Sequence, residues 1–214
     1  VSRNAATIPA TLIDAELLLG VSDALGMVGE ADVITPARMP LDLPTSSALS
    51  LLAKAKPTLA GRKIGVLVAE GTDADVLACL RDAVEAAGAK LDVIAPKIGG
   101  AISKRGDHIA ADHALRGAPS FFFDAVVVLT STGGTKALLG DAAAVAFVRD
   151  AFEHAKVIGY GKSSLPLLEK AGVTLDEGTL GVSGQRDTAR FIARAERGRV
   201  FTRSEPTHDA PKGR

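Results

Sequence analysis

The stretch KVIGYGKSSLPLLEKAG, from Lys156 to Gly172, predicts a buried strand, a sharp glycine turn and a helix in immediate succession. The same order occurs earlier in the chain, where the apolar run KIGVLVAE (63–70) precedes the helical pattern GTDADVLACLRDAVEAAG (71–88). The apolar residues within KIGVLVAE are continuous, as expected for a strand that is covered on both faces. Strands that alternate with helices indicate a parallel sheet between two layers of helices.

The rest of the chain continues this alternation. Further strands are expected in KLDVIAP (90–96), DAVVVLTS (124–131) and the weaker GTLGVSG (178–184), with helices over 141–155 and 185–198 and an irregular stretch from Lys97 to Ser120. Thr72 or Asp73 can cap the first of these helices, which Gly88 ends. With right-handed crossovers, the pattern predicts an α/β, flavodoxin-like three-layer sandwich with a parallel sheet of about five strands.

The beginning of the chain has a different pattern. Apolar residues at helical spacing predict one amphipathic helix: Leu12, Leu17, Val21 and Leu25. Three prolines follow, at positions 36, 40 and 44, and they favour an extended tether. We therefore predict a helical segment (1–28), a proline-rich linker (29–61), a flavodoxin-like domain (62–200) and a tail (201–214). A lone helix cannot bury its own apolar face, so we expect it to dock on another body.

Composition excludes several classes of function. Lys and Arg together number 25, as do Asp and Glu, so the formal net charge is 0 and no basic face for nucleic acid is indicated. No apolar run approaches the roughly 18 residues of a membrane span, and the start shows no signal peptide. A single cysteine permits a reducing cytoplasm, where we place the chain. Four scattered histidines make no zinc pattern.

Three turns qualify as ligand sites, because in such sheets ligands bind at the carboxyl ends of the strands. They are AEGTD (69–73), TSTGGTK (130–136) and GYGKSS (159–164). The last is not a Walker phosphate loop, since that loop needs a glycine at the position of Lys156.

The second turn resembles the flavodoxin phosphate loop, and it supplies weak candidates for anion binding: Thr130, Thr132, Gly133, Gly134 and Thr135. It follows the third strand rather than the first, and only 4% of the residues are aromatic, which disfavours a stacked flavin. The alternative is a small-residue turn with a Thr cap.

The glycines around Tyr160 also fit a nucleophile elbow, a sharp turn between strand and helix that exposes one side chain. A phenol is a poor nucleophile, because its pKa lies near 10. The only thiol, Cys79, is expected on the apolar side of a helix as a small hydrophobe. Glu70, at the end of the first strand, is either an acid that points into the elbow cleft or a solvated residue. We therefore predict no catalytic residue, with Tyr160 a degenerate elbow and Glu70 a vestigial acid.

Two other features have ordinary explanations. His154 complements the dipole at a helix C-terminus. Four arginines form one face of the last helix, either as a solvated surface or as an ion-pair surface between subunits or domains: Arg186, Arg190, Arg194 and Arg197.

The order of these segments resembles the C-terminal domain of large-subunit haem catalases, in the class I glutamine-amidotransferase-like or PfpI-like superfamily. The resemblance extends from about Ser46 to Arg203, through FFFDAVVVLTSTGG (121–134) and FIARAERGRVFTR (191–203). The earlier LIDAELLLGVSDALGM (12–27) resembles the end of the catalase helical region. Since the sequence begins at Val1, we expect a processed chain or a piece of a longer one.

The resemblance implies a fold without its catalytic set. PfpI-type proteases and deglycases use an elbow cysteine, an acid from the end of the first strand and often a histidine, whereas Tyr160 stands at the elbow here and Glu70 alone matches. The implied roles are to stabilise a homotetramer by contact with the catalase core, to narrow access to the haem channel, and to bind unfolded client proteins. Haem would belong to the catalase portion, since its distal and proximal motifs are missing from this sequence. The alternatives are a freestanding PfpI-like hydrolase, deglycase or chaperone, and an FMN-binding carrier.

Overall fold

The computed structural model describes residues 15–24, 26, 46–50 and 54–204. The chain divides into two units, Val1–Lys54 and Ala55–Arg214, each of which is described by itself. In the first unit, helix α2 (Ala15–Ala24) lies within the predicted helical segment. The predicted helix positions Leu12 and Leu25, most of the linker at 29–61 and most of the tail at 201–214 lie outside the described residues.

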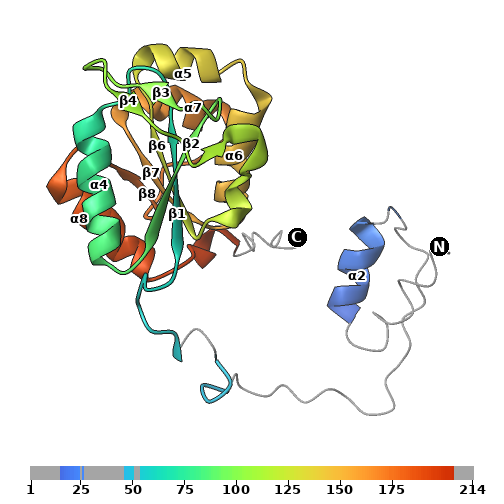
Figure 1. Cartoon of the computed structure of the whole chain (residues 1–214). Helices are drawn as coiled ribbons and strands as arrows, with labels where there is room; N and C mark the ends of the chain where they lie inside the picture. The colour runs from blue at the N-terminus through green and yellow to red at the C-terminus, as the bar shows by residue number, and fades with distance from the viewer. Residues whose placement is uncertain (1–14, 25, 27–45, 51–53, 205–214) are drawn as a thin grey trace. The chain divides into compact units, whose positions relative to one another are not determined.

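The second unit is built around one six-stranded sheet in the order β5-β2-β1-β6-β7-β8 (Figure 1). Its strands are β1 (Lys63–Val68), β2 (Lys90–Ala95), β5 (His113–Ala114), β6 (Ala125–Leu129), β7 (Val157–Tyr160) and β8 (Thr179–Gly181). Every neighbouring pair is parallel. Without the short edge strand β5, the order is the 2-1-3-4-5 of flavodoxin. The predicted flavodoxin-like sandwich is therefore confirmed.

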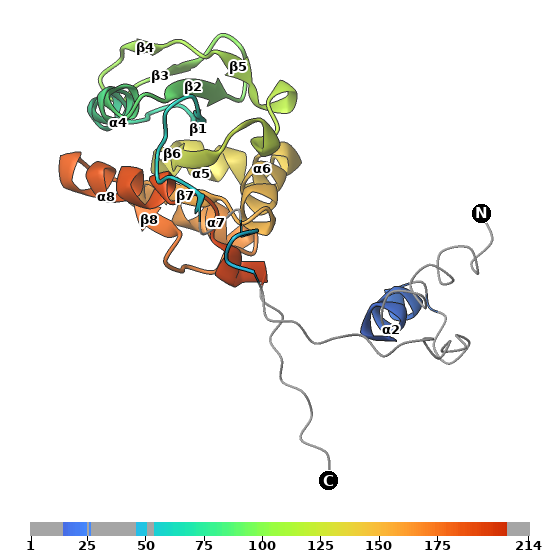
Figure 2. The same ribbon diagram turned by 90° about the horizontal axis from the view of Figure 1, so that it is seen from below.

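Helices cover both faces of this sheet (Figures 1 and 2). The helices α4 (Ala74–Ala86) and α8 (Gln185–Glu196) bury Leu80 and Phe191 in one apolar cluster. The helices α5 (Thr132–Leu138), α6 (Ala142–Glu153) and α7 (Leu165–Lys170) contribute to a second cluster on the other face. Because successive strand side chains point to opposite faces, β1 supplies Val66 to the first cluster and Leu67 to the second.

Short-range sequence signals set the ends of these helices. Asp73 caps α4, because its carboxylate accepts hydrogen bonds from the backbone N–H groups of Asp75 and Val76. Asp141 caps α6 in the same way. Gly88 follows α4 with a φ of 75°, which lets the chain turn into β2. Of the two predicted caps for α4, Asp73 is thus the one that the structure uses.

The stretch from Lys97 to Ser120, predicted as irregular, holds short regular elements. A hairpin forms from β3 (Ala101–Ile102) and β4 (His108–Ile109), and β5 then joins the edge of the main sheet. Two 3₁₀ turns follow, η1 (Leu115–Gly117) and η2 (Ser120–Phe122). Strands of two residues are too short to show a sequence period, so this part of the prediction was wrong.

A buried lysine anchors the loop that leads into β6. Lys156 is only 1% exposed, and its Nζ donates hydrogen bonds of 2.6 Å to the carbonyl oxygens of Ser120 and Phe123. Burial disfavours the ammonium ion and lowers the pKa of Lys156 to about 8, with a smaller contribution from Arg199. This side chain ties the start of β7 to the loop before the neighbouring strand.

Arg203, in the last described turn η4 (Phe201–Ser204), anchors the loop that leads into β8. Its guanidinium donates two hydrogen bonds to the Asp176 carboxylate, at 2.6 and 2.8 Å, and a third to the backbone oxygen of Lys156. It also lies 4.3 Å above the centre of the Phe152 ring. Burial alone would raise the pKa of Asp176, but the bonds from Arg203 hold it at about 2.

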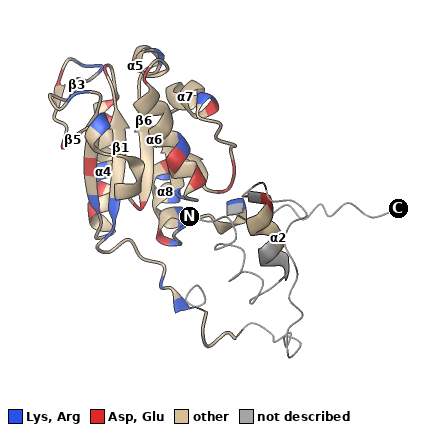
Figure 3. Cartoon of the chain, turned by 90° about the vertical axis from the view of Figure 1, so that its right-hand side faces the viewer, with Lys and Arg blue, Asp and Glu red and all other residues tan. Residues whose placement is uncertain are grey.

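Charged residues of both signs lie on α4. Figure 3 shows acidic and basic residues interspersed along α4, whose charged residues include Asp75, Arg81, Asp82 and Glu85. Among the helices in the described ranges, none is long and apolar enough to cross a membrane.

The buried Lys156 predicts a pH-dependent stability. Between about pH 8 and about pH 10.5 the folded state has released the Lys156 proton while the unfolded state keeps it, so the free energy of unfolding gains a contribution as pH rises. Lys156→Met removes this contribution. Urea unfolding at both ends of that range should show the stability of the wild type rising relative to the variant. Parallel pH dependence in the two proteins would contradict the assignment.

Candidate functional site

The sheet brings the three candidate turns together at the carboxyl ends of β1, β6 and β7. Strand order reverses between β1 and β6, and that switch point is where open α/β sheets bind their ligands. The turns at 69–73 and 130–136 flank the switch point, and the turn at 159–164 lies next to them. The three turns thus lie at the same edge of the sheet, and whether they form a ligand site stays a prediction that their side chains must support.

The Thr72 side chain lies at the switch point, and its hydroxyl bonds to backbone groups of the protein itself. Its side chain is 1% exposed, and its Oγ1 lies 2.6 Å from the carbonyl oxygen of Leu129 in β6 and 2.7 Å from that of Ala69. The same oxygen accepts a hydrogen bond from the Ala69 N–H. A bridge thus joins the chain after β1 to the end of β6.

Ser131 forms a second bridge across the same gap. Its Oγ donates a 2.6 Å hydrogen bond to the backbone oxygen of Glu70, and it accepts one from the N–H of Gly134 at the start of α5. The cap of α5 is therefore Ser131, not the threonine that the sequence suggested. Both hydroxyls at the switch point, those of Thr72 and Ser131, serve the backbone.

The hydroxyls of the predicted anion loop face one another. Thr130 Oγ1 lies 2.6 Å from Thr135 Oγ1 and 2.8 Å from Ser164 Oγ, and all three side chains are buried. Ser164 also donates to the backbone oxygen of Val128, and Thr135 to that of Ser163. Thr132 and Gly133 are exposed at the start of α5. The hydroxyls of Thr130 and Thr135 therefore make hydrogen bonds that join the end of β6 to the turn after β7.

Gly134 is needed for packing. A Cβ atom on this residue would lie 2.8 Å from the Ala69 Cβ and 2.9 Å from the backbone oxygen of Glu70. Such distances are too short for a real Cβ, so only glycine lets the first turn of α5 approach the end of β1. The glycine that resembled part of a phosphate cradle is explained by this close approach.

Glu70 is exposed, and its carboxylate accepts a 3.0 Å hydrogen bond from the N–H of Ile102 in β3. It also lines a pocket of about 280 Å³ together with Lys97, Gly133 and Gly134. The residues that line this pocket include no hydroxyl, thiol or imidazole group. The strand-end acid therefore holds the β3–β4 hairpin, and the pocket beside it offers no hydroxyl, thiol or imidazole group for catalysis.

Tyr160 is the last residue of β7, paired with Val128 of β6 and Gly181 of β8. Its half-buried side chain packs against the second apolar cluster. Nucleophile elbows hold their reactive residue in a strained turn, but in the described part of the chain Ala155 is the only non-glycine residue with positive φ. Gly161, which follows, has an ordinary φ of −74°. The strained geometry of an elbow is thus absent at Tyr160 and Gly161.

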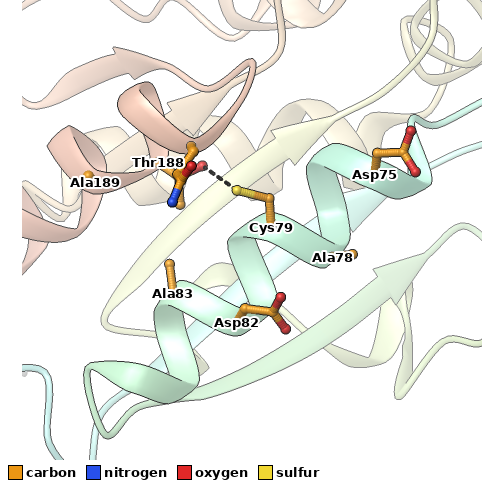
Figure 4. Close-up of a pocket in the computed structure, with 8 residues that line it drawn as sticks. Asp75, Ala78, Cys79, Asp82, Ala83, Thr188 and Ala189 are labelled. Atoms are coloured by element: carbon orange, nitrogen blue, oxygen red, sulfur yellow. Dashed lines mark hydrogen bonds between the residues drawn. The ribbon is translucent and has the colours of Figure 1, made fainter.

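Cys79 lies away from these turns, in an open groove of about 670 Å³ between α4 and α8 (Figure 4). Its Sγ lies 4.0 Å from Thr188 Oγ1, and the side chain is half-buried. Leu80 and Val84 are fully buried on α4, whereas Cys79 is not. Cys79 was expected within the apolar core, but it lies at the border of the core. No histidine or lysine lines the groove to activate the thiol.

The predicted arginine face of α8 is largely solvated. Arg186, Arg190 and Arg197 are exposed, while Arg194 is half-buried, lies 3.6 Å from Glu177 and donates to the backbone oxygen of Gly198. His154 caps the C-terminus of α6, as its place in the sequence suggested. The role of the arginine face between subunits stays a prediction.

Residues 60–203 match the family described as the C-terminal domain found in long catalases. The chain belongs to this family. Catalase C of Rhizobium meliloti (strain 1021) is 40% identical over 200 residues, which are 91% of this chain and 28% of that protein. Catalase HPII of Mycobacterium avium is 35% identical over 131 residues, which are 61% of this chain and 19% of that protein. Catalase-B of Dictyostelium discoideum is 29% identical over 201 residues, which are 93% of this chain and 29% of that protein. The chain thus spans less than a third of the length of these relatives.

Catalases are haem enzymes, but the described residues of this catalase C-terminal domain do not fit a haem. An axial tyrosine must project into a cavity that admits the porphyrin, whereas Tyr160, the one tyrosine in the sequence, packs against the apolar cluster under α5, α6 and α7. His113 is held by the buried carboxylate of Asp92, 3.3 Å away. Within the described ranges, no group of three or more His, Cys, Asp or Glu side chains could hold a metal ion.

The bridge at the switch point makes a direct prediction about stability. Thr72→Val removes the hydroxyl but keeps the shape, and the buried backbone groups that it served lose a partner, so the free energy of unfolding should fall by about 1–3 kcal/mol. Thr72→Ser should recover most of the loss. The exposed Thr132→Val is the matched control, expected within about 0.5 kcal/mol of wild type. Equal stabilities of the Thr72→Val and Thr132→Val proteins in denaturant unfolding would refute the bridge.

Proposed function

We propose that this chain is the non-catalytic C-terminal portion of a large-subunit catalase and that it stabilises the assembled enzyme. The parent enzyme would decompose hydrogen peroxide to water and oxygen with haem held elsewhere in the polypeptide. The observation that carries this proposal is the closed switch point, where Thr72 and Ser131 bond to backbone groups of the domain itself. A ligand that entered between Thr72 and Leu129, or between Ser131 and Glu70, would have to break these bonds.

The family match supports the same proposal, because it ties the chain to long catalases, in which such a domain is one part of a larger polypeptide. The freestanding hydrolase or deglycase is less well supported. Such an enzyme needs an activated nucleophile beside an acid, and the pocket beside Glu70 contains none. An FMN carrier finds no support either, since the hydroxyls of Thr130 and Thr135 bond to other groups of the protein.

A tethered domain can stabilise an oligomer through simple thermodynamics. Any folded unit that binds the assembled state and not the unfolded state shifts the equilibrium toward assembly. A covalent linker raises the effective concentration of the domain at its partner, so weak contacts suffice. The proposed partner is the catalase core, in a homotetramer.

Two further roles implied by the resemblance are separate hypotheses. Narrowing of access to the haem channel predicts that loss of the domain speeds inhibition by bulky haem ligands more than by small ones. Binding of unfolded clients predicts that the domain suppresses aggregation of a heated test protein at near-stoichiometric amounts. Each can fail while the stabilising role stands.

Deletion of residues 55–214 from the parent catalase tests the stabilising role. We expect turnover of peroxide at 25 °C to stay within about twofold, because chemistry lies elsewhere, while the half-life of activity on heating falls at least about fivefold, as a loss of 1 kcal/mol or more implies. Deletion of residues 205–214 alone is the control and should leave both unchanged. A deleted enzyme with unchanged half-life and unchanged subunit assembly on gel filtration would contradict the proposal.

A further inference from the structure

The loops at the amino end of the sheet expose a set of large apolar side chains. They are Phe121 (60% exposed), Phe122 (56%), Leu175 (56%) and Phe201 (47%), which together we call the amino-edge patch. Phe121 and Phe122 lie in η2 before β6, Leu175 lies before β8, and Phe201 lies in η4 after α8. In a parallel sheet all loops that lead from helix to strand lie at this edge, opposite the closed switch point.

The phenylalanine pair is held rigidly. Its neighbours on both sides, Ser120 and Phe123, are buried, and the Lys156 ammonium group binds the carbonyl oxygens of both. The two exposed rings pack edge to face, with centroids 4.7 Å apart. Aromatic side chains that are ordered before binding lose little entropy when a partner covers them, which is typical of interface anchors.

The other two members of the patch belong to the same framework. Leu175 precedes Asp176, which Arg203 binds, and Phe201 lies in the turn that carries Arg203. Arg203 in turn binds the backbone oxygen of Lys156, so the hydrogen bonds of these two cations connect the loops that carry the patch. Exposed charged residues, among them Glu177 and Arg199, lie in the same loops. Apolar groups with charged neighbours are the usual composition of a docking surface.

The two ends of the described domain lie beside this patch, and this indicates what covers it. The described chain enters β1 at Lys63 and reaches its last turn, η4, at this same end of the sheet (Figure 1). The residues matched by Catalase C of Rhizobium meliloti are 28% of that protein, so most of a long catalase lies outside this domain. Polypeptide attached to either connection therefore starts beside the amino-edge patch.

We infer that the amino-edge patch docks the domain on an apolar surface of the remaining polypeptide of a long catalase. The inference rests on the proposed function and adds to it the face that makes the contact. It assigns the contact to the amino edge, with Phe121 and Phe122 as the anchors.

The test uses the whole parent catalase, with a protease site placed in the predicted linker, residues 29–61. After cleavage of the folded enzyme, gel filtration over time measures how fast the domain is released. We expect the wild-type domain to stay bound and the Phe121→Ser/Phe122→Ser variant to leave at least about tenfold faster, since the variant lacks the two aromatic side chains that docking would bury. Ile98→Ser is the matched control, because Ile98 is 64% exposed in the loop after β2, at the opposite edge, and it should behave as wild type.

The outcomes separate this inference from the proposed function. Equal release of the phenylalanine variant and wild type overturns the inference, as does faster release of the Ile98→Ser domain alone. Dimerisation of the released wild-type domain, lost in the phenylalanine variant, would assign the patch to a second copy and also overturn it. Should the phenylalanine variant fail to fold by circular dichroism, Leu175→Ser/Phe201→Ser replaces it with the same expectation. The proposed function is judged by the deletion of residues 55–214, so it can stand while the inference fails.

Discussion

The hydrogen bonds of Thr72 and Ser131 across the gap between β1 and β6 are the constraint on which the rest of the domain depends. In a sheet of this order the connections that follow the two strands run to opposite faces of the sheet, and the crevice between them is ordinarily available to a ligand. Here the Thr72 hydroxyl reaches Leu129 and the Ser131 hydroxyl reaches Glu70, so hydrogen bonds of the protein itself cross the gap. Gly134 completes the closure, since it lets α5 pack directly on the end of β1.

The two edges of the sheet differ in how their loops are held. At the carboxyl edge, the hydroxyls of Thr130, Thr135 and Ser164 bond to one another and to the backbone. At the amino edge, Lys156 and Arg203 bury their charges in order to hold loops that present apolar side chains to the outside. Burying a cation is costly unless it is fully hydrogen-bonded, so such anchors are expected where loop position matters. This division favours a domain that supports a larger assembly over one that binds a small molecule.

Much of the fold could be predicted, because its strands are continuous apolar runs and its helices begin at capping residues such as Asp73 and Asp141. The elements β3, β4 and β5 could not, since two residues show no period. The order of the strands predicted that the three candidate turns lie at one edge of the sheet. It did not predict the hydrogen bonds that cross the gap between β1 and β6. Thr72 and Leu129 are 57 positions apart, and Lys156 binds carbonyl groups 36 and 33 positions away, so no local pattern reveals either interaction. The elbow at Tyr160 was suggested by glycine spacing alone, which does not determine φ.

The measurement that tests the central claim most directly is an absorption spectrum of the protein purified from its natural source, with a denaturing gel of the same sample. The account predicts a Soret band and a polypeptide of catalase length that contains these residues, or a catalase-sized companion that copurifies with them. A colourless sample that contains this chain alone would contradict it, because the domain would then act without a catalase.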